Sequence, residues 1–154
     1  MPTRYTELNS PITLFNSSDL DYIGDGSLSP GSAVFDNTLP GNRNLYGALS
    51  LSLKNTGVRK RDATIEVFIV PMVSPPGGSL TQEMSIEGDC IDNYYVEEFK
   101  IDGSTGQRLL TLDNVLLFPG MSRFYFRNNI GVSFSAGNTA WLSTYTFEHV
   151  AGGS

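Results

Sequence analysis

The chain has 154 residues, of which only 17% are charged, and it contains 16 Gly and 8 Pro. This composition excludes a coiled coil or a helical bundle, which would be rich in Ala, Glu, Lys and Leu, and the length fits one domain. The formal net charge of −6, from 10 basic and 16 acidic side chains, disfavours a protein that neutralises nucleic-acid phosphates.

Residues 1–44 carry short apolar clusters separated by Asn, Ser, Asp, Gly and Pro. The clusters at 12–15 and 33–35 cannot bury much surface by themselves, so we predict an extended arm or an irregular first layer of strands. We expect such an arm to order on contact with another subunit. Its candidate partner-binding residues are Arg4, Tyr5, Ile12, Leu14 and Phe15.

From Leu45 onward, apolar and polar residues alternate in the way that half-buried strands require. Leu45, Leu49, Leu51 and Leu53 share one face of the first such strand, because side chains two apart in a strand point the same way. A second strand spans 63–70, and the Asn-Thr-Gly at 55–57 closes a hairpin between the two. The basic cluster 59–61 fits a solvated hairpin tip.

Pro71 ends this ladder, because proline has no N–H to donate to it. We predict a long loop over 73–90, which is either a contact or a disordered excursion. Short strands follow, with turns between them and no helical period anywhere. The predicted strands span 94–101, 109–112, 115–118, 123–127, 132–135 and 140–150, with turns that include 113–114 and 119–120.

About eight short strands, with turns every 8–12 residues or so, predict an all-β fold in which residues 45–150 form an antiparallel two-sheet sandwich. A jelly roll is favoured over an immunoglobulin-like fold, because Cys90 is the only cysteine and Trp141 lies near the end of the chain. The tail 151–154 is predicted to fray.

The residues offer little catalytic or metal-binding chemistry. His149 is the only histidine and Cys90 the only cysteine, and no Gly-x-Ser-x-Gly elbow occurs. The carboxylates at 19–26 resemble a calcium loop, but Ile23 and Pro30 stand where oxygen ligands belong, which favours simple turns. We therefore predict no enzyme activity, metal site, cofactor or small-molecule substrate.

The aromatic side chains are the candidate interaction residues. The Tyr94-Tyr95 pair and the run 124–126 place rings on both faces of a strand. One face belongs to the core; the other is either an exposed interface or is covered by the arm and the second sheet. Both alternatives stay open, and Tyr94 and Tyr95 join the candidate partner-binding residues.

Several short motifs in 45–147 occur in an order that resembles the jelly-roll cement or decoration proteins of tailed-bacteriophage capsids. They are Leu45-Tyr-Gly, Glu66-Val-Phe-Ile-Val-Pro71, a Gly/Pro loop, Leu116-Leu-Phe-Pro-Gly120, Arg127-Asn-Asn-Ile-Gly-Val-Ser133 and Gly137-Asn-Thr139. The resemblance covers about two-thirds of the chain, and each motif alone is unspecific. It leaves the first 44 residues without a counterpart and supplies no catalytic residue.

The resemblance implies a virion structural protein that binds the outside of an icosahedral shell and clamps neighbouring subunits. Its partners would be the major capsid protein and copies of itself, as a dimer or trimer. The longest apolar run, 67–73, is far below the ~20 residues that span a membrane, so we expect a soluble protein made in the host cytoplasm.

The alternative function is a carbohydrate- or receptor-binding β-sandwich module of a phage tail or fibre. Trp141 would be its sugar-stacking residue, with help from the Tyr94-Tyr95 pair, while loop Asn and Asp side chains supply hydrogen bonds. The position of Trp141 in the fold discriminates this alternative from the first.

Overall fold

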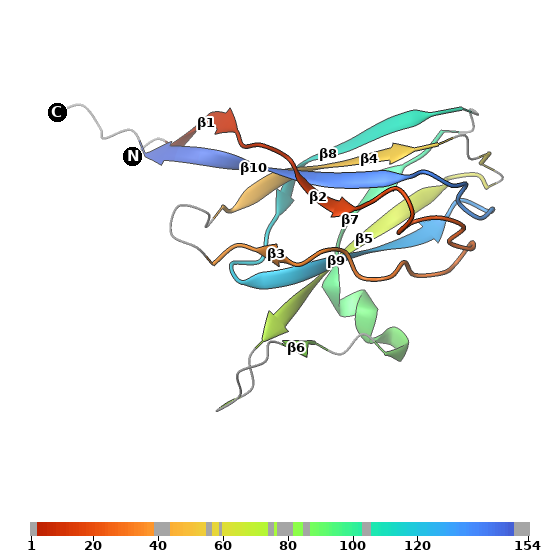
Figure 1. The fold of residues 1–154 in the computed structure, drawn as a ribbon, viewed down its shortest axis with the longest axis horizontal. Coiled ribbons are helices and arrows are strands. Elements are labelled where there is room, and N and C mark those ends of the chain that lie inside the picture. The colour runs from red at the N-terminus through yellow and green to blue at the C-terminus, as the bar shows by residue number, and fades with distance from the viewer. Residues whose placement is uncertain are drawn as a thin grey trace.

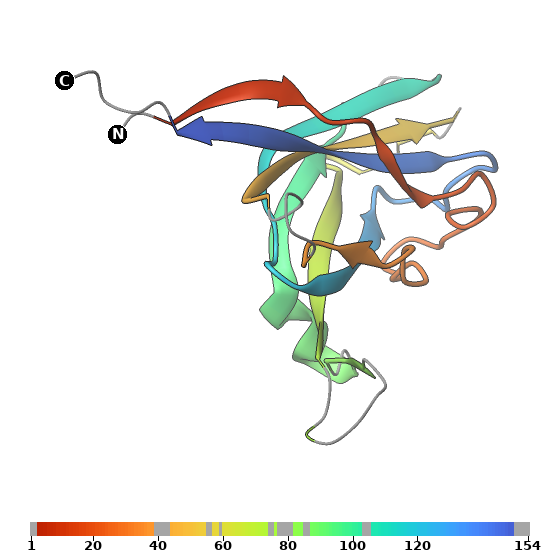
Figure 2. The ribbon, with the colours of Figure 1, turned by 60° about the vertical axis from the view of Figure 1, so that its left-hand side comes forward.

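The computed structural model describes residues 3–38, 44–54, 57–58, 60–73, 76, 82–84, 87–102 and 106–149. Across these residues the chain forms ten strands and one short 3-10 helix, arranged as two antiparallel sheets packed face to face (Figures 1 and 2). The predicted all-β two-sheet sandwich is therefore confirmed. The predicted turn residues 55–56, Arg59 and the tail 151–154 lie outside the described residues.

The first sheet contains five strands in four positions. β10 pairs along one edge with two strands in succession, β1 and β2, and along the other with β4, which pairs in turn with the edge strand β8. These strands are β1 (Thr3–Leu8), β2 (Ile12–Phe15), β4 (Tyr46–Leu53), β8 (Arg108–Leu116) and β10 (Thr139–His149).

The second sheet repeats this arrangement. β9 lies between β3 and β5, and the far edge of β5 pairs with β7 and then with β6. The bounds are β3 (Phe35–Asp36), β5 (Thr64–Val73), β6 (Gln82–Glu83), β7 (Tyr95–Lys100) and β9 (Met121–Asn129). A 3-10 helix, η1 (Gly88–Tyr94), leads directly into β7.

The strand order is that of a jelly roll. With the accessory strands β1 and β6 set aside, the sheets read β2-β10-β4-β8 and β3-β9-β5-β7. When the eight remaining strands are renumbered from 1 to 8 in chain order, the first sheet reads 1-8-3-6 and the second sheet reads 2-7-4-5. Apart from β5 and β7, which pair in the second sheet, successive strands thus cross between the sheets, as two Greek keys do.

Of the two forms predicted for the N-terminal segment, β2 and β3 follow the irregular first layer of strands rather than a separate arm. β2 and β3 belong to opposite sheets, and Leu14 and Phe15 are 2% and 0% exposed in the core. The ring centroid of Phe15 lies 4.9 Å from that of Phe126 in β9. The early apolar clusters are too short to form a core alone, but they complete one that later strands begin, so the sandwich starts near Ile12 rather than at Leu45.

One part of the N-terminal segment does extend beyond the sandwich. β4 pairs with β10 only as far as Thr144, whereas β1 pairs with β10 from Tyr145 to His149. Figures 1 and 2 show β1 and the end of β10 leaving the body together, close to both chain termini. We call this two-stranded extension the ribbon.

The core forms where the predicted alternation places it, with two local shifts. Leu49, Leu51 and Leu53 are fully buried, but Leu45 precedes β4 and is 55% exposed, and the register with β8 shifts between Gly47 and Leu49. β8 continues through 113–114, which were predicted to be a turn. Asn114 instead takes a left-handed conformation (φ 55°) inside the strand, opposite that shift, as a β-bulge does.

The predicted loop 73–90 contains more structure than expected. β5 continues through Pro71 to Val73, β6 pairs with its end, and η1 begins at Gly88. Ile91 of η1 packs with Phe68, Val70 and Tyr125 in a second apolar cluster. Tyr125 is the outward-facing aromatic residue of the run 124–126, and this cluster covers its ring, which leaves Tyr125 only 6% exposed.

Candidate binding surfaces

An apolar groove lies between the start of β7 and the end of β8. Its volume is about 300 Å³. We call it the edge groove, and it is lined by Ile69, Pro71, Asn93, Tyr94, Tyr95, Val96, Leu116, Leu117, Phe118 and Pro119.

The rim of the edge groove exposes several large apolar side chains. Leu116 is 57% exposed, Tyr95 46% and Val96 36%. Leu45 is 55% exposed, and its carbonyl accepts a 2.9 Å hydrogen bond from the N–H of Leu117. Because Leu117 lines the edge groove, Leu45 adjoins the same rim. Contiguous apolar exposure of this kind marks interaction surfaces in soluble proteins.

The predicted partner-binding residues fall in four different places. Tyr94 and Tyr95 line the edge groove, whereas Leu14 and Phe15 are inside the core and Ile12 is 42% exposed beside the opening between β2 and β3. Arg4 and Tyr5 lie in the ribbon, opposite Glu148 and Phe147 of β10. The structure thus brings Tyr94 and Tyr95 together and separates them from the arm residues.

Trp141 occupies the outer face of the first sheet. Its neighbours Ala140 and Leu142 are fully buried, and alternation directs the Trp141 ring to the opposite face, where it is half-buried. The hollow beside it has a volume of about 450 Å³. Tyr94 and Tyr95 line a different hollow, so the predicted cooperation of these three aromatic residues is not seen.

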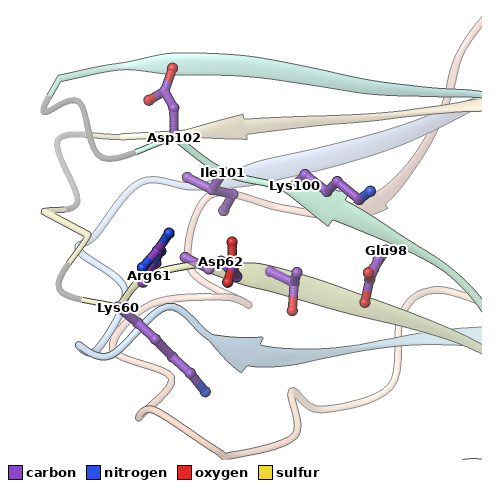
Figure 3. A pocket seen from close by; sticks show the side chains of 9 residues that line it. Lys60, Arg61, Asp62, Glu98, Lys100, Ile101 and Asp102 are labelled. Atoms are coloured by element: carbon purple, nitrogen blue, oxygen red, sulfur yellow. The ribbon is translucent and has the colours of Figure 1, made fainter.

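A further hollow, of about 880 Å³, lies beside the start of β5 and the end of β7. Figure 3 shows its side chains diverging: Lys60 points toward β9, Lys100 along β7, and Asp102 away from both. Three cations and three anions line it, so its charges largely cancel. Lys60 donates a hydrogen bond to Asn129. The connection that carries Lys60 is not the predicted hairpin, because β4 and β5 belong to opposite sheets.

The carboxylates at 19–26 act as acceptors for backbone amides. Asp21 Oδ1 accepts a hydrogen bond from the N–H of Gly137 at 2.8 Å, and Asp25 Oδ1 accepts one from the N–H of Gly131 at 2.9 Å. Asp19 accepts one from Asn16 within its own turn. Each carboxylate therefore fastens a different loop, as the turn interpretation requires.

Two arginines of β9 form ion pairs with Glu83 of β6 and Asp92 of η1. Arg127 Nη2 lies 2.7 Å from both Glu66 Oε2 and Asp92 Oδ1, and its guanidinium stacks 4.9 Å from the Phe68 ring centroid. The hydrogen bond to Asp92 is the main cause of the raised pKa of Arg127. Arg123 Nε lies 3.0 Å from Glu83 Oε1 in the same way.

Tyr125 completes this attachment. Its hydroxyl donates a hydrogen bond to the Glu83 carboxylate. Burial of the phenol, with this hydrogen bond, raises the pKa of Tyr125 to about 12. These contacts cannot be read from the sequence, because Glu83 and Asp92 lie far along the chain from the β9 arginines.

No group of three or more His, Cys, Asp or Glu in the described ranges could hold a metal ion. Likewise, no helix among the residues placed by the structure is long and apolar enough to cross a membrane. Comparison of the chain with family models, with curated proteins and with solved structures gives no match.

Proposed function

We propose that this chain is a virion structural protein that attaches to the outer surface of an icosahedral phage capsid and clamps neighbouring subunits. The edge groove carries the proposal, because it presents apolar side chains that a protein surface would cover. The order of short motifs across 45–147 and the jelly-roll topology are the further support.

The shape of the molecule suits attachment at more than one point. The ribbon extends from the sandwich in a different direction from β6 (Figure 2). Each strand of the ribbon has a backbone edge, and such edges can pair with another chain. The net charge of −6 fits the outside of a particle, away from the packaged genome.

The first experiment is a density gradient of lysate from the native source, probed for this chain. Sedimentation with capsid-sized particles at a fixed ratio to the shell protein is the expected result. A chain that remains at the top of the gradient as a small oligomer contradicts the proposal.

Two leucines of one strand then test the edge groove. Leu116 lines the groove, and Leu109, at the other end of β8, is 67% exposed and lies outside it. Leu116→Asp should remove co-sedimentation with particles assembled without the chain, because it places a charge in the apolar contact. Leu109→Asp, the matched control, should sediment like the unaltered protein. Equal behaviour of the two variants would exclude the edge groove as the docking surface.

A further inference from the structure

On the outer face of the first sheet, Trp141 lies in a row with uncharged polar side chains from the neighbouring strands. In the sheet register, Trp141 lies opposite Thr13 of β2 on one side and opposite Ser50 of β4 on the other. Ser50 lies opposite Thr111 of β8, and their hydroxyl oxygens are 3.3 Å apart. The row therefore crosses all four positions of the sheet without a charged side chain.

The hollow beside Trp141 has the same chemistry. It is lined by Thr13, Asn16, Ser17 and Thr139 together with Pro11, Ala140 and Trp141, and none of these side chains is charged. At about 450 Å³ its volume falls in the range of ligand pockets, roughly 300–1,000 Å³. Thr13 belongs to both the hollow and the row, so the two form one continuous surface.

This surface favours one class of ligand. An aromatic face covers the apolar side of a sugar ring, while hydroxyl and amide groups bond its hydroxyls. A nucleic acid or an acidic glycan would need cations, which the row lacks, and the net charge of −6 would repel it.

We propose that the outer face of the first sheet binds a neutral oligosaccharide, with Trp141 stacking against one sugar ring. Three strand spacings separate Thr13 from Thr111, about 14 Å in all, so the row accommodates several linked rings rather than one. This binding site is distinct from the edge groove and does not depend on the capsid proposal.

The single tryptophan provides a direct readout, because all tryptophan fluorescence comes from Trp141. We would titrate the full chain with cello-, malto-, xylo-, manno- and N-acetylchitohexaose, with a polygalacturonate hexamer as the acidic comparison. A saturable change in emission with at least one neutral hexamer, and none with the acidic one, is the expected result. No saturable change with any neutral hexamer overturns the proposal.

Variants then locate the binding site by calorimetry with the neutral hexamer that binds. Trp141→Ala should weaken binding at least tenfold, and Ser50→Glu, which adds a charge to the row without removing the indole, should do the same. Tyr95→Ala, in the edge groove, is the matched aromatic control and should bind like the unaltered chain. Unchanged binding by folded Ser50→Glu or Trp141→Ala would overturn the assignment.

Discussion

Two serine hydroxyls make the N-terminal segment part of the second sheet. The N–H of Phe124 donates to Ser32 Oγ at 2.8 Å, and the N–H of Phe126 donates to Ser29 Oγ at 3.0 Å. In return, the Ser32 and Ser29 backbone amides donate to the carbonyls of Phe124 and Phe126 at 2.9 and 2.7 Å. The segment thus satisfies the free edge of β9 as a neighbouring strand would.

Ser32→Ala removes one of these acceptors. Phe124 is fully buried and Ser32 is 3% exposed, so water cannot replace the lost oxygen. A buried donor left without a partner costs about 1–3 kcal/mol, and the double change Ser29→Ala/Ser32→Ala should cost about 2–6 kcal/mol. Against a typical domain stability of about 5–15 kcal/mol, the double change is a severe perturbation.

Urea unfolding measures the loss. With a slope of about 2 kcal/mol per molar urea, Ser32→Ala should lower the unfolding midpoint by about 0.5–1.5 M. Ser10→Ala, at an exposed position, is the matched control and should change stability by less than about 0.5 kcal/mol. A double variant that unfolds at the midpoint of the unaltered protein would refute the view that residues 29–32 form an edge of the sheet.

Two further predictions concern the polar contacts of β9. The fully buried Asn128 donates hydrogen bonds to the carbonyls of Ile23 and Val132 at 2.8 and 2.7 Å and accepts one from the N–H of Ile130 at 3.0 Å. Asn128→Ala should lower the free energy of unfolding, measured by urea titration, by about 2–4 kcal/mol. A loss under about 1 kcal/mol would contradict this prediction. The pKa of Tyr125 is raised from 10.0 to about 12, so the contribution of its protonated phenol to the free energy of unfolding is complete below pH 10 and is lost as the pH rises through 12. Tyr125→Phe should therefore lose less stability between pH 10 and pH 12 than the unaltered chain does. Identical plots of stability against pH for the two proteins would disprove this coupling.

Strands with strict local alternation could be predicted from the sequence. In β4 and β5 the period of two is visible within eight to ten residues, and it identifies the buried face directly. β2 and β3 have only four and two residues, so no period can be read from them. The place of β2 in the fold depends on β10, more than a hundred residues away, and the place of β3 depends on β9, about 85 residues away.

The same distance in sequence limits prediction of the sites. Tyr94 and Tyr95 were identified as aromatic candidates, and they do line a groove, but its other wall comes from 116–119. The burial of Leu14 and Phe15 depends on distant strands, so exposure could not be inferred for them. Buried Asn128 looks like any turn asparagine in the sequence, because its three partners lie in loops that only the fold brings together.

The edge groove alone can support only weak attachment. Full burial of a large apolar side chain contributes about 1.5–3 kcal/mol, so covering what remains exposed of Leu45, Tyr95, Val96 and Leu116 contributes about 1 kcal/mol each. A total of about 4 kcal/mol corresponds to a dissociation constant near 1 mM, before the entropy lost on association. Stable attachment through this surface therefore requires several contacts at once. A clamp that adds the ribbon as a second contact, or an oligomer on a repeating shell, meets that requirement through effective concentration rather than through a stronger single site.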